Sequence, residues 1–118
     1  MPVSRGDVGL ANVRFISGAG SKFRPVLIVQ NDKNNARLQS TIIALITSNT
    51  SRAHTATQLR IDVSTTDGAA SGLLHESVAK AENLLTIMQA DIRRIIGHLP
   101  DSLMVRMDEC MRQSLGIG

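Results

Sequence analysis

The chain has little aromatic character: it contains no tryptophan or tyrosine and only two phenylalanines, Phe15 and Phe23. An aromatic groove of the kind that SH3-like modules use to bind proline-rich peptides cannot be built from two rings. Aromatic rings also stack on the bases of single-stranded RNA, and these two side chains are the candidates for such contacts. A place in the hydrophobic core is the competing interpretation for each of them.

Cysteine, long apolar runs and metal-ligand patterns are also scarce. Cys110 is the single cysteine, so no internal disulfide can form, which favours a reducing compartment such as the cytoplasm. No stretch resembles a signal peptide or approaches the ~20 apolar residues of a membrane helix. No pair of histidines or cysteines has ligand spacing, and the acidic residues do not cluster. We therefore expect a cytoplasmic protein that uses no membrane, metal or other cofactor.

Charge is distributed unevenly along the chain. A length of 118 residues predicts one domain, residues 1–118. Residues 1–60 hold eight basic and two acidic residues, a balance of +6, whereas residues 61–118 hold five basic and eight acidic residues, a balance of −3. A basic half suits a polyanionic ligand, because contacts with phosphate supply most of the affinity that does not depend on sequence. The alternative interpretation is that these charges lie on a solvated surface, are unevenly distributed and bind no polyanion.

Short strands and one helix account for the apolar pattern. We expect strands at residues 7–13, 25–31, 41–47, 58–63 and around 77–81, with a helical turn at 91–94. The apolar runs at 26–29 and 42–46 leave no polar face, so both faces of these strands should be covered. One helix cannot cover both faces of these strands, and a second copy of the chain could cover the rest.

The clearest helix begins near residue 102. Its apolar residues form one stripe at helical spacing, which is typical of a helix packed on a core: Leu103, Met104, Met107, Cys110, Met111 and Leu115. Asp101 is the expected N-cap, and Gly116 is expected just past the end. The sequence therefore predicts a mostly β or α+β fold, a small sheet with a C-terminal helix.

Arg24 stands where a glycine-containing loop meets an apolar strand. The next residue, Pro25, is expected to start the strand, because proline donates no hydrogen bond to a sheet. A rigid strand beside a flexible loop is a good place for a guanidinium to contact a phosphate. The alternative is that Arg24 is a solvated residue at the start of the strand and binds nothing.

Five short motifs resemble those of the PemK/MazF family of toxin endoribonucleases, and they span nearly the whole chain. They are Arg5-Gly6-Asp7-Val8, Arg24-Pro25-Val26-Leu27-Ile28 with Gln30-Asn31-Asp32, Ala44-Leu45-Ile46-Thr47-Ser48, Ser77-Val78 with Glu82-Asn83, and Ser114-Leu115-Gly116. The resemblance implies a strongly curved antiparallel sheet of the SH3-like barrel kind. It also implies a homodimer, a single-stranded RNA substrate and a small acidic antitoxin as partner.

The resemblance assigns roles to individual residues. It makes Arg24 and Thr47 the catalytic pair of a metal-independent cleavage, in which a 2′-hydroxyl attacks and a 2′,3′-cyclic phosphate and a 5′-hydroxyl result. The candidates for RNA binding are Lys22, Phe23, Ser48, Asn49, Arg52, His54, Ser77, Glu82 and Asn83. The general base stays open, because arginine is a poor base. His54 and His75 could carry the proton, or they could be ordinary surface histidines.

A toxin of the same fold that poisons DNA gyrase without catalysis is the alternative function. That related family lacks the Arg-Pro strand start and ends its last helix in a tryptophan-containing sequence. This chain has Arg24-Pro25 and no tryptophan. The loop at 19–22 departs from many members of the resembled family, so the resemblance does not imply which RNA sequence is recognised.

Overall fold

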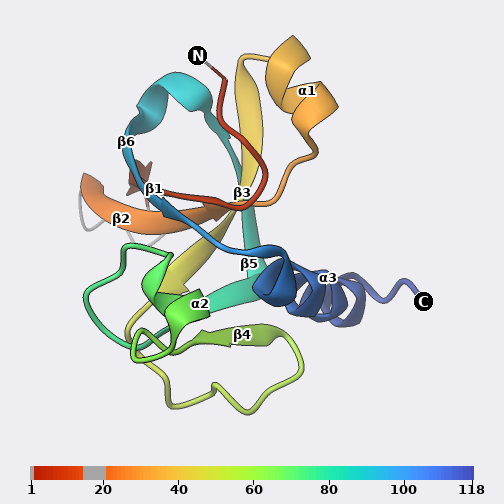
Figure 1. Ribbon diagram of the computed structural model, residues 1–118. Coiled ribbons are helices and arrows are strands. Elements are labelled where there is room, and N and C mark those ends of the chain that lie inside the picture. The colour runs from red at the N-terminus through yellow and green to blue at the C-terminus, as the bar shows by residue number, and fades with distance from the viewer. Residues whose placement is uncertain (1, 15–20) are drawn as a thin grey trace.

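One antiparallel sheet of six strands forms the body of the protein, and one long helix packs on it (Figure 1). The computed structural model describes residues 2–14 and 21–118. In chain order the elements are β1 (Asp7–Arg14), β2 (Ser21–Ile28), α1 (Asp32–Arg37), β3 (Ser40–Thr47), β4 (Gln58–Ile61), α2 (Thr66–Ala69), β5 (Ser77–Met88), the 3-10 turn η1 (Gln89–Asp91), β6 (Ile92–His98) and α3 (Asp101–Leu115). The strand order is β4-β5-β3-β2-β1-β6. Among the described strands β4 and β6 form the two edges, so the curved sheet does not close into a barrel.

The two faces of the sheet bury separate groups of apolar side chains. α3 covers one face with the predicted stripe, of which Leu103, Met104, Met107 and Cys110 are buried, whereas Leu115 is exposed. The opposite face buries a second group: Ala11, Val13, Val26, Ile28, Ile43 and Leu45. Ile87 of β5 and Ile92 of β6 pack against that group. A single chain therefore covers both faces, and the apolar strands by themselves give no reason to expect a second copy.

The starts of two elements differ from the sequence prediction. β2 begins at Ser21, so Pro25 lies inside the strand, paired with Leu10 of β1. Pairing of β2 with β3 begins only at Val26. At Pro25 the strand therefore has a neighbour on one side, as at a sheet edge, where proline is tolerated. In α3 the N-cap is Pro100 rather than Asp101, which lies in the first helical turn.

Most other boundaries are close to the prediction, but β5 runs to Met88, well past the predicted end near residue 81. Gly116 ends α3 with a φ of 69°, the left-handed conformation that glycine adopts without strain. The turn expected at 91–94 lies slightly earlier, at Gln89–Asp91, because residues 92–94 pair with β1 as part of β6. No helix in the described part of the chain is long and apolar enough to cross a membrane.

The residues before β1 connect elements that are far apart in sequence. The Arg5 N–H donates to Asp32 Oδ1 at the start of α1 (2.6 Å), and the Arg5 guanidinium pairs with Asp108 of α3. His98 Nδ1 of β6 lies 2.9 Å from Asp7 Oδ1 of β1. These contacts fix the edge strand β6 and the helix α3 relative to β1.

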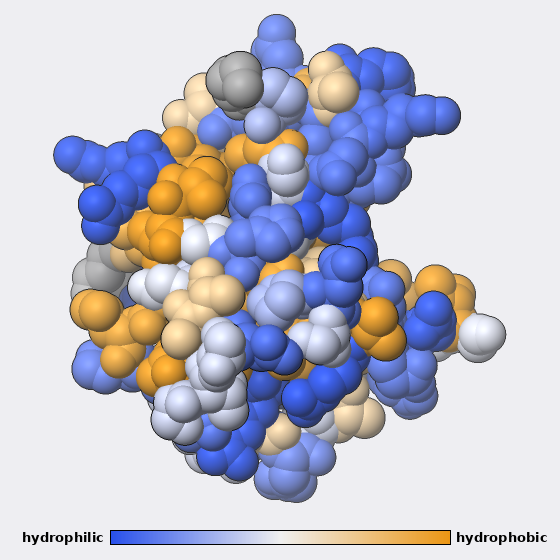
Figure 2. Space-filling view, viewed as in Figure 1, coloured by the Kyte–Doolittle hydropathy of each residue, from blue (hydrophilic) through white to orange (hydrophobic). Residues whose placement is uncertain are grey.

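The loop that follows α2 passes unusually close to β6. Gly72 has a φ of +74°, and a Cβ atom there would lie 2.0 Å from the carbonyl oxygen of Ile96. A Cβ atom on the facing Gly97 would lie 2.3 Å from the backbone of this loop. Apolar side chains gather over β6 and this loop (Figure 2), where Ile95 and Leu74 are exposed. The close approach fixes the loop against the sheet.

Candidate active site

Arg24 and Thr47 lie on the neighbouring strands β2 and β3. The register pairs Val26 with Leu45, and continuing it by two residues places Arg24 opposite Thr47. Thr47 is the last residue of β3, and its Oγ1 accepts a hydrogen bond from the Asn49 N–H (3.2 Å). Both side chains are half-buried. The two residues that the resemblance makes the catalytic pair are therefore neighbours in space, just beyond the point where β2 and β3 stop pairing.

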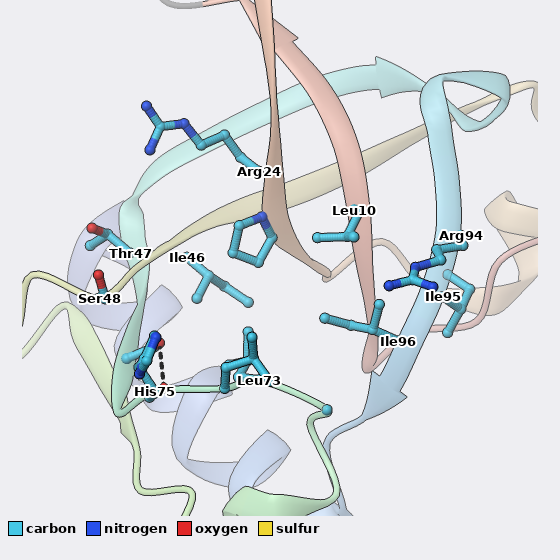
Figure 3. Close-up of a pocket in the computed structure, with 14 residues that line it drawn as sticks. Leu10, Arg24, Ile46, Thr47, Ser48, Leu73, His75, Arg94, Ile95 and Ile96 are labelled. Carbon is cyan, nitrogen blue, oxygen red and sulfur yellow. Dashed lines mark hydrogen bonds between the residues drawn. The ribbon is translucent and has the colours of Figure 1, made fainter.

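A cavity of about 630 Å³ borders this pair (Figure 3). Its middle is apolar and is lined by Leu10, Ile46 and Leu73, and Pro25 is also in the lining. Polar side chains stand at one end, namely Arg24, Thr47, Ser48 and His75. Ser77 is also in the lining. Arg94 of β6 stands at the other end. An apolar floor suits the flat face of a base, and the cations suit phosphates.

A second cavity, of about 330 Å³, shares Arg24, Ile46 and Thr47 with the first, so these residues form a common wall. The rest of its lining is mostly polar and comes from β4, β5 and the loop after β3: Leu45, Asn49, Ser51, Arg52, Gln58, Lys80 and Asn83. Amide and guanidinium groups of this kind can hydrogen-bond the edges of unstacked bases.

A bulge brings β5 into the second cavity. Midway along β3 the register with β5 shifts, so residues 81–83 have no partner on β3. Bulges re-aim side chains and are common beside active sites. Asn83 lines the cavity, while Glu82 accepts a hydrogen bond from Nε2 of the buried Gln58 (2.7 Å). Burial opposes the charge of Glu82, but hydrogen bonds, chiefly from Gln58, outweigh it and hold the pKa of Glu82 below its ordinary value.

The electrostatic character of the site is cationic. Four basic side chains line the two cavities, namely Arg24, Arg52, Lys80 and Arg94, and no carboxylate is among the described lining residues. In the described part of the chain no three His, Cys, Asp or Glu side chains are grouped so as to hold a metal ion. The arrangement suits a bound polyanion whose phosphates meet guanidinium and ammonium groups.

Of the predicted RNA-binding residues, Phe23 and His54 lie outside the two cavity linings, whereas Ser77 lines the first cavity. The ring of Phe23 is 48% exposed, so it is not a core residue, and the guanidinium of Arg93 lies 4.9 Å from its centroid. His54 is exposed and lines neither cavity. Ser77 is buried, and its hydroxyl donates to the His75 carbonyl (2.8 Å), so it supports the backbone. Phe15 and the side chain of Lys22 lie outside what the structure describes.

Comparison with known proteins identifies a family. The model of the PemK-like, MazF-like toxins of type II toxin–antitoxin systems matches residues 4–115. Endoribonuclease EndoA of Bacillus subtilis (strain 168) is 33% identical, over 99% of this chain and 97% of its own length. Endoribonuclease MazF6 of Mycobacterium tuberculosis (strain ATCC 25618 / H37Rv) is 34% identical, over 99% of this chain and 100% of its own length.

Solved structures share the fold. The Mycobacterium tuberculosis toxin MazF-mt6 has a TM-score of 0.77 at 26% identity, with 95% of this chain and 98% of that chain covered. A mycobacterial endoribonuclease in complex with its cognate antitoxin has a TM-score of 0.78 at 21% identity, with 98% and 97% covered. The predicted antiparallel sheet with a C-terminal helix is thus confirmed. The chain belongs to the PemK-like, MazF-like family of toxins of type II toxin–antitoxin systems.

Proposed function

We propose that the protein is the toxin of a type II toxin–antitoxin pair and acts as a metal-independent endoribonuclease on single-stranded RNA. The observation that carries this proposal is the wall between the two cavities, where Arg24 lies opposite Thr47 among cations and no described carboxylate. An RNA strand that crosses the wall puts one phosphate beside the pair and a nucleotide in each cavity. The endoribonuclease names of the relatives support the same reaction.

In the proposed reaction the 2′-hydroxyl beside the scissile phosphate is the nucleophile. Its oxygen bonds to phosphorus as the bond to the 5′ oxygen breaks, which leaves a 2′,3′-cyclic phosphate and a 5′-hydroxyl. Arg24 donates two hydrogen bonds to the non-bridging oxygens, where negative charge grows in the transition state. The Thr47 hydroxyl both donates and accepts, so it can hold the phosphate and the ribose in line. A nucleophile that belongs to the substrate needs no metal-activated water.

Sequence preference would arise in the second cavity. Asn49, Arg52 and Asn83 present donors and acceptors to a base that enters it. The carboxylate of Glu82 holds Gln58 in place by their 2.7 Å hydrogen bond, which keeps this side of the cavity in one arrangement.

Cleavage in a chelator tests the reaction. Purified protein in excess EDTA should cut a long single-stranded RNA into discrete fragments whose new 5′ ends carry a hydroxyl. The same RNA annealed to its complement should stay intact, because bases stacked in a duplex cannot enter the cavities. Activity that disappears in EDTA and returns with magnesium would contradict the mechanism.

A second copy of the chain and a small acidic antitoxin are the proposed protein partners. Leu74 and Ile95, which are 88% and 44% exposed at the first cavity, suit contact with a second copy. The cationic cavities suit an acidic antitoxin segment that folds onto them and excludes RNA.

Sedimentation tests both partners. At micromolar concentration the free protein should sediment with about twice the chain mass of 12.7 kDa. A labelled, non-cleavable RNA should sediment with the protein and should be released when the cognate antitoxin is added. A monomer at this concentration would contradict the dimer, and RNA that stays bound beside the antitoxin would contradict a shared surface.

A further inference from the structure

Among the described residues that line the cavities, one side chain is suited to accept a proton near neutral pH. Arginine and lysine are ordinarily protonated there, and hydroxyl and amide groups are very weak bases. No carboxylate is among the described residues that line either cavity. His75 lines the first cavity together with Arg24, Thr47 and Ser48 (Figure 3). Imidazole is the side chain whose ordinary pKa, about 6.5, lies closest to neutrality.

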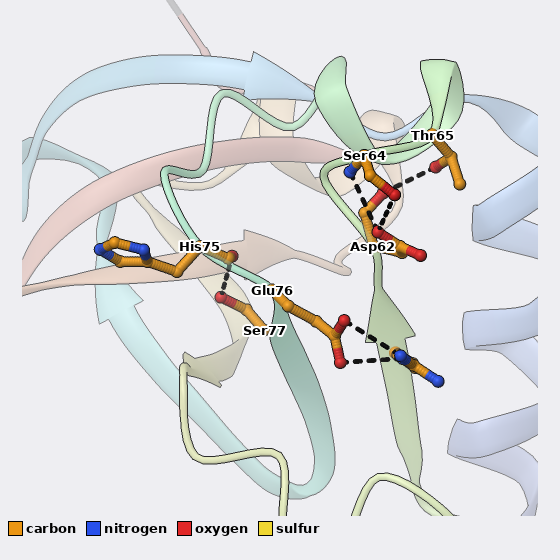
Figure 4. A network of polar contacts seen from close by, with 7 residues as sticks. Asp62, Ser64, Thr65, His75, Glu76 and Ser77 are labelled. Atoms are coloured by element: carbon orange, nitrogen blue, oxygen red, sulfur yellow. Dashed lines mark hydrogen bonds and ion pairs between the residues drawn. The ribbon is translucent and has the colours of Figure 1, made fainter.

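The loop that carries His75 is held at three points. Gly72 contacts β6 so closely that no side chain fits between them. The Ser77 hydroxyl donates to the His75 carbonyl (2.8 Å), and Arg60 of β4 donates two hydrogen bonds of 3.0 Å to Glu76 (Figure 4). The imidazole points away from the Glu76 carboxylate. A backbone held in this way keeps the imidazole in a fixed position, as efficient proton transfer requires.

We propose that His75 is the general base of the cleavage, an inference that rests on the proposed endoribonuclease function. The neutral imidazole accepts the proton of the 2′-hydroxyl as that oxygen bonds to phosphorus. The 5′ oxygen leaves with a proton taken from water, and the imidazolium then returns its proton to the solvent. The charged groups that share the cavity with His75 are Arg24 of β2 and Arg94 of β6, while the neighbouring Glu76 is paired with Arg60.

The pH profile of single-turnover cleavage tests the role. The wild-type rate should rise with pH from the acid side and then level off, because only the neutral imidazole can accept a proton. His75→Ala should lose at least ~100-fold in rate, the lower end for loss of a general base, and should lose the rising limb. Added imidazole should restore part of the rate. The control is His98→Gln, at a histidine that lines neither cavity, where the new amide can still donate to Asp7; it should keep the wild-type rate and profile.

Binding of an RNA with a 2′-deoxy nucleotide at the cleavage site separates chemistry from affinity. His75→Ala should bind this RNA as tightly as the wild type does. Two results would overturn the assignment of His75 as general base: a wild-type rate and pH profile in His75→Ala, or a loss of RNA binding that accounts for the whole loss of rate. Either result would leave the endoribonuclease proposal standing. A folded wild-type protein that binds RNA and never cleaves it would overturn both.

Discussion

Arg24→Ala should lower the rate of RNA cleavage by at least ~100-fold, the scale for losing one preorganised donor to developing negative charge. Arg24 lies in the wall between the two cavities, where its guanidinium can meet a phosphate from either side. Arg24→Lys should also lose most of the rate, because an ammonium group cannot form two parallel hydrogen bonds to a phosphate. The measurement is single-turnover cleavage of a short RNA at saturating protein.

Two controls make the Arg24 result specific. Arg106→Ala removes the same charge from an exposed position on α3, so it should cleave at the wild-type rate. Circular dichroism melting should show that the Arg24 variants are folded, because this half-buried side chain lies outside both core groups. Thr47→Ala should also be slow, whereas Thr47→Ser should keep much of the rate because it keeps the hydroxyl. Near-wild-type cleavage by a folded Arg24→Ala protein would remove the central residue of the mechanism.

Gly72→Ala should destabilise the protein by at least ~2 kcal/mol. The new methyl group would lie 2.0 Å from the Ile96 carbonyl oxygen, so the backbone of the loop or of β6 must move. Overpacking of this kind costs about 1–3 kcal/mol, and a positive φ at a residue other than glycine costs about 1–3 kcal/mol more. The loop leads to His75, so cleavage should be slow even in the fraction that is folded.

Gly116→Ala is the matched control for Gly72→Ala. Gly116 has a φ of +69°, close to that of Gly72, but a Cβ atom there would meet nothing within 4 Å. This variant should therefore bear only the backbone strain, the ~1–3 kcal/mol that a positive φ costs. Urea unfolding of both variants gives the comparison as a difference in midpoint at equal slope. Equal midpoints for the two would show that the loop does not need its close approach to β6.

The sequence predicts the site where a motif coincides with a strand. Val26 and its apolar neighbours mark β2, and the Arg-Pro start locates Arg24 at the end of that apolar run. Thr47 follows from the apolar run of β3 in the same way. Antiparallel pairing of two such strands then brings the two side chains together. This pairing is the part of the site that local pattern and family resemblance can supply.

Other site residues could not be predicted, because register and curvature place them. Lys80 and Arg94 lie in strands where they look like ordinary solvent-facing positions, and both come from the half of the chain with negative net charge. The family resemblance names Asn83, but the bulge of β5 that brings it to the second cavity has no turn signal in the sequence. Charge counted along the chain therefore does not locate the cationic surface. The prediction that Pro25 starts β2 was wrong for a different reason. Proline can lie inside this strand because β3 pairs with β2 only from Val26 onward.

The pairing of β1 with β6 has a consequence for synthesis of the protein. Asp7 pairs with His98, and Arg5 pairs with Asp108, so the edge of β1 that faces away from β2 stays unpaired until the last strand is made. Contacts of such long sequence separation form late in folding, because closing a long loop costs entropy before the contact forms. A chain ending at Met88 lacks β6 and the Arg94 end of the first cavity, and we expect it to leave RNA intact in the cleavage assay. Under the proposed function, we therefore expect a nascent chain on the ribosome to be inactive as a nuclease until β6 has been made.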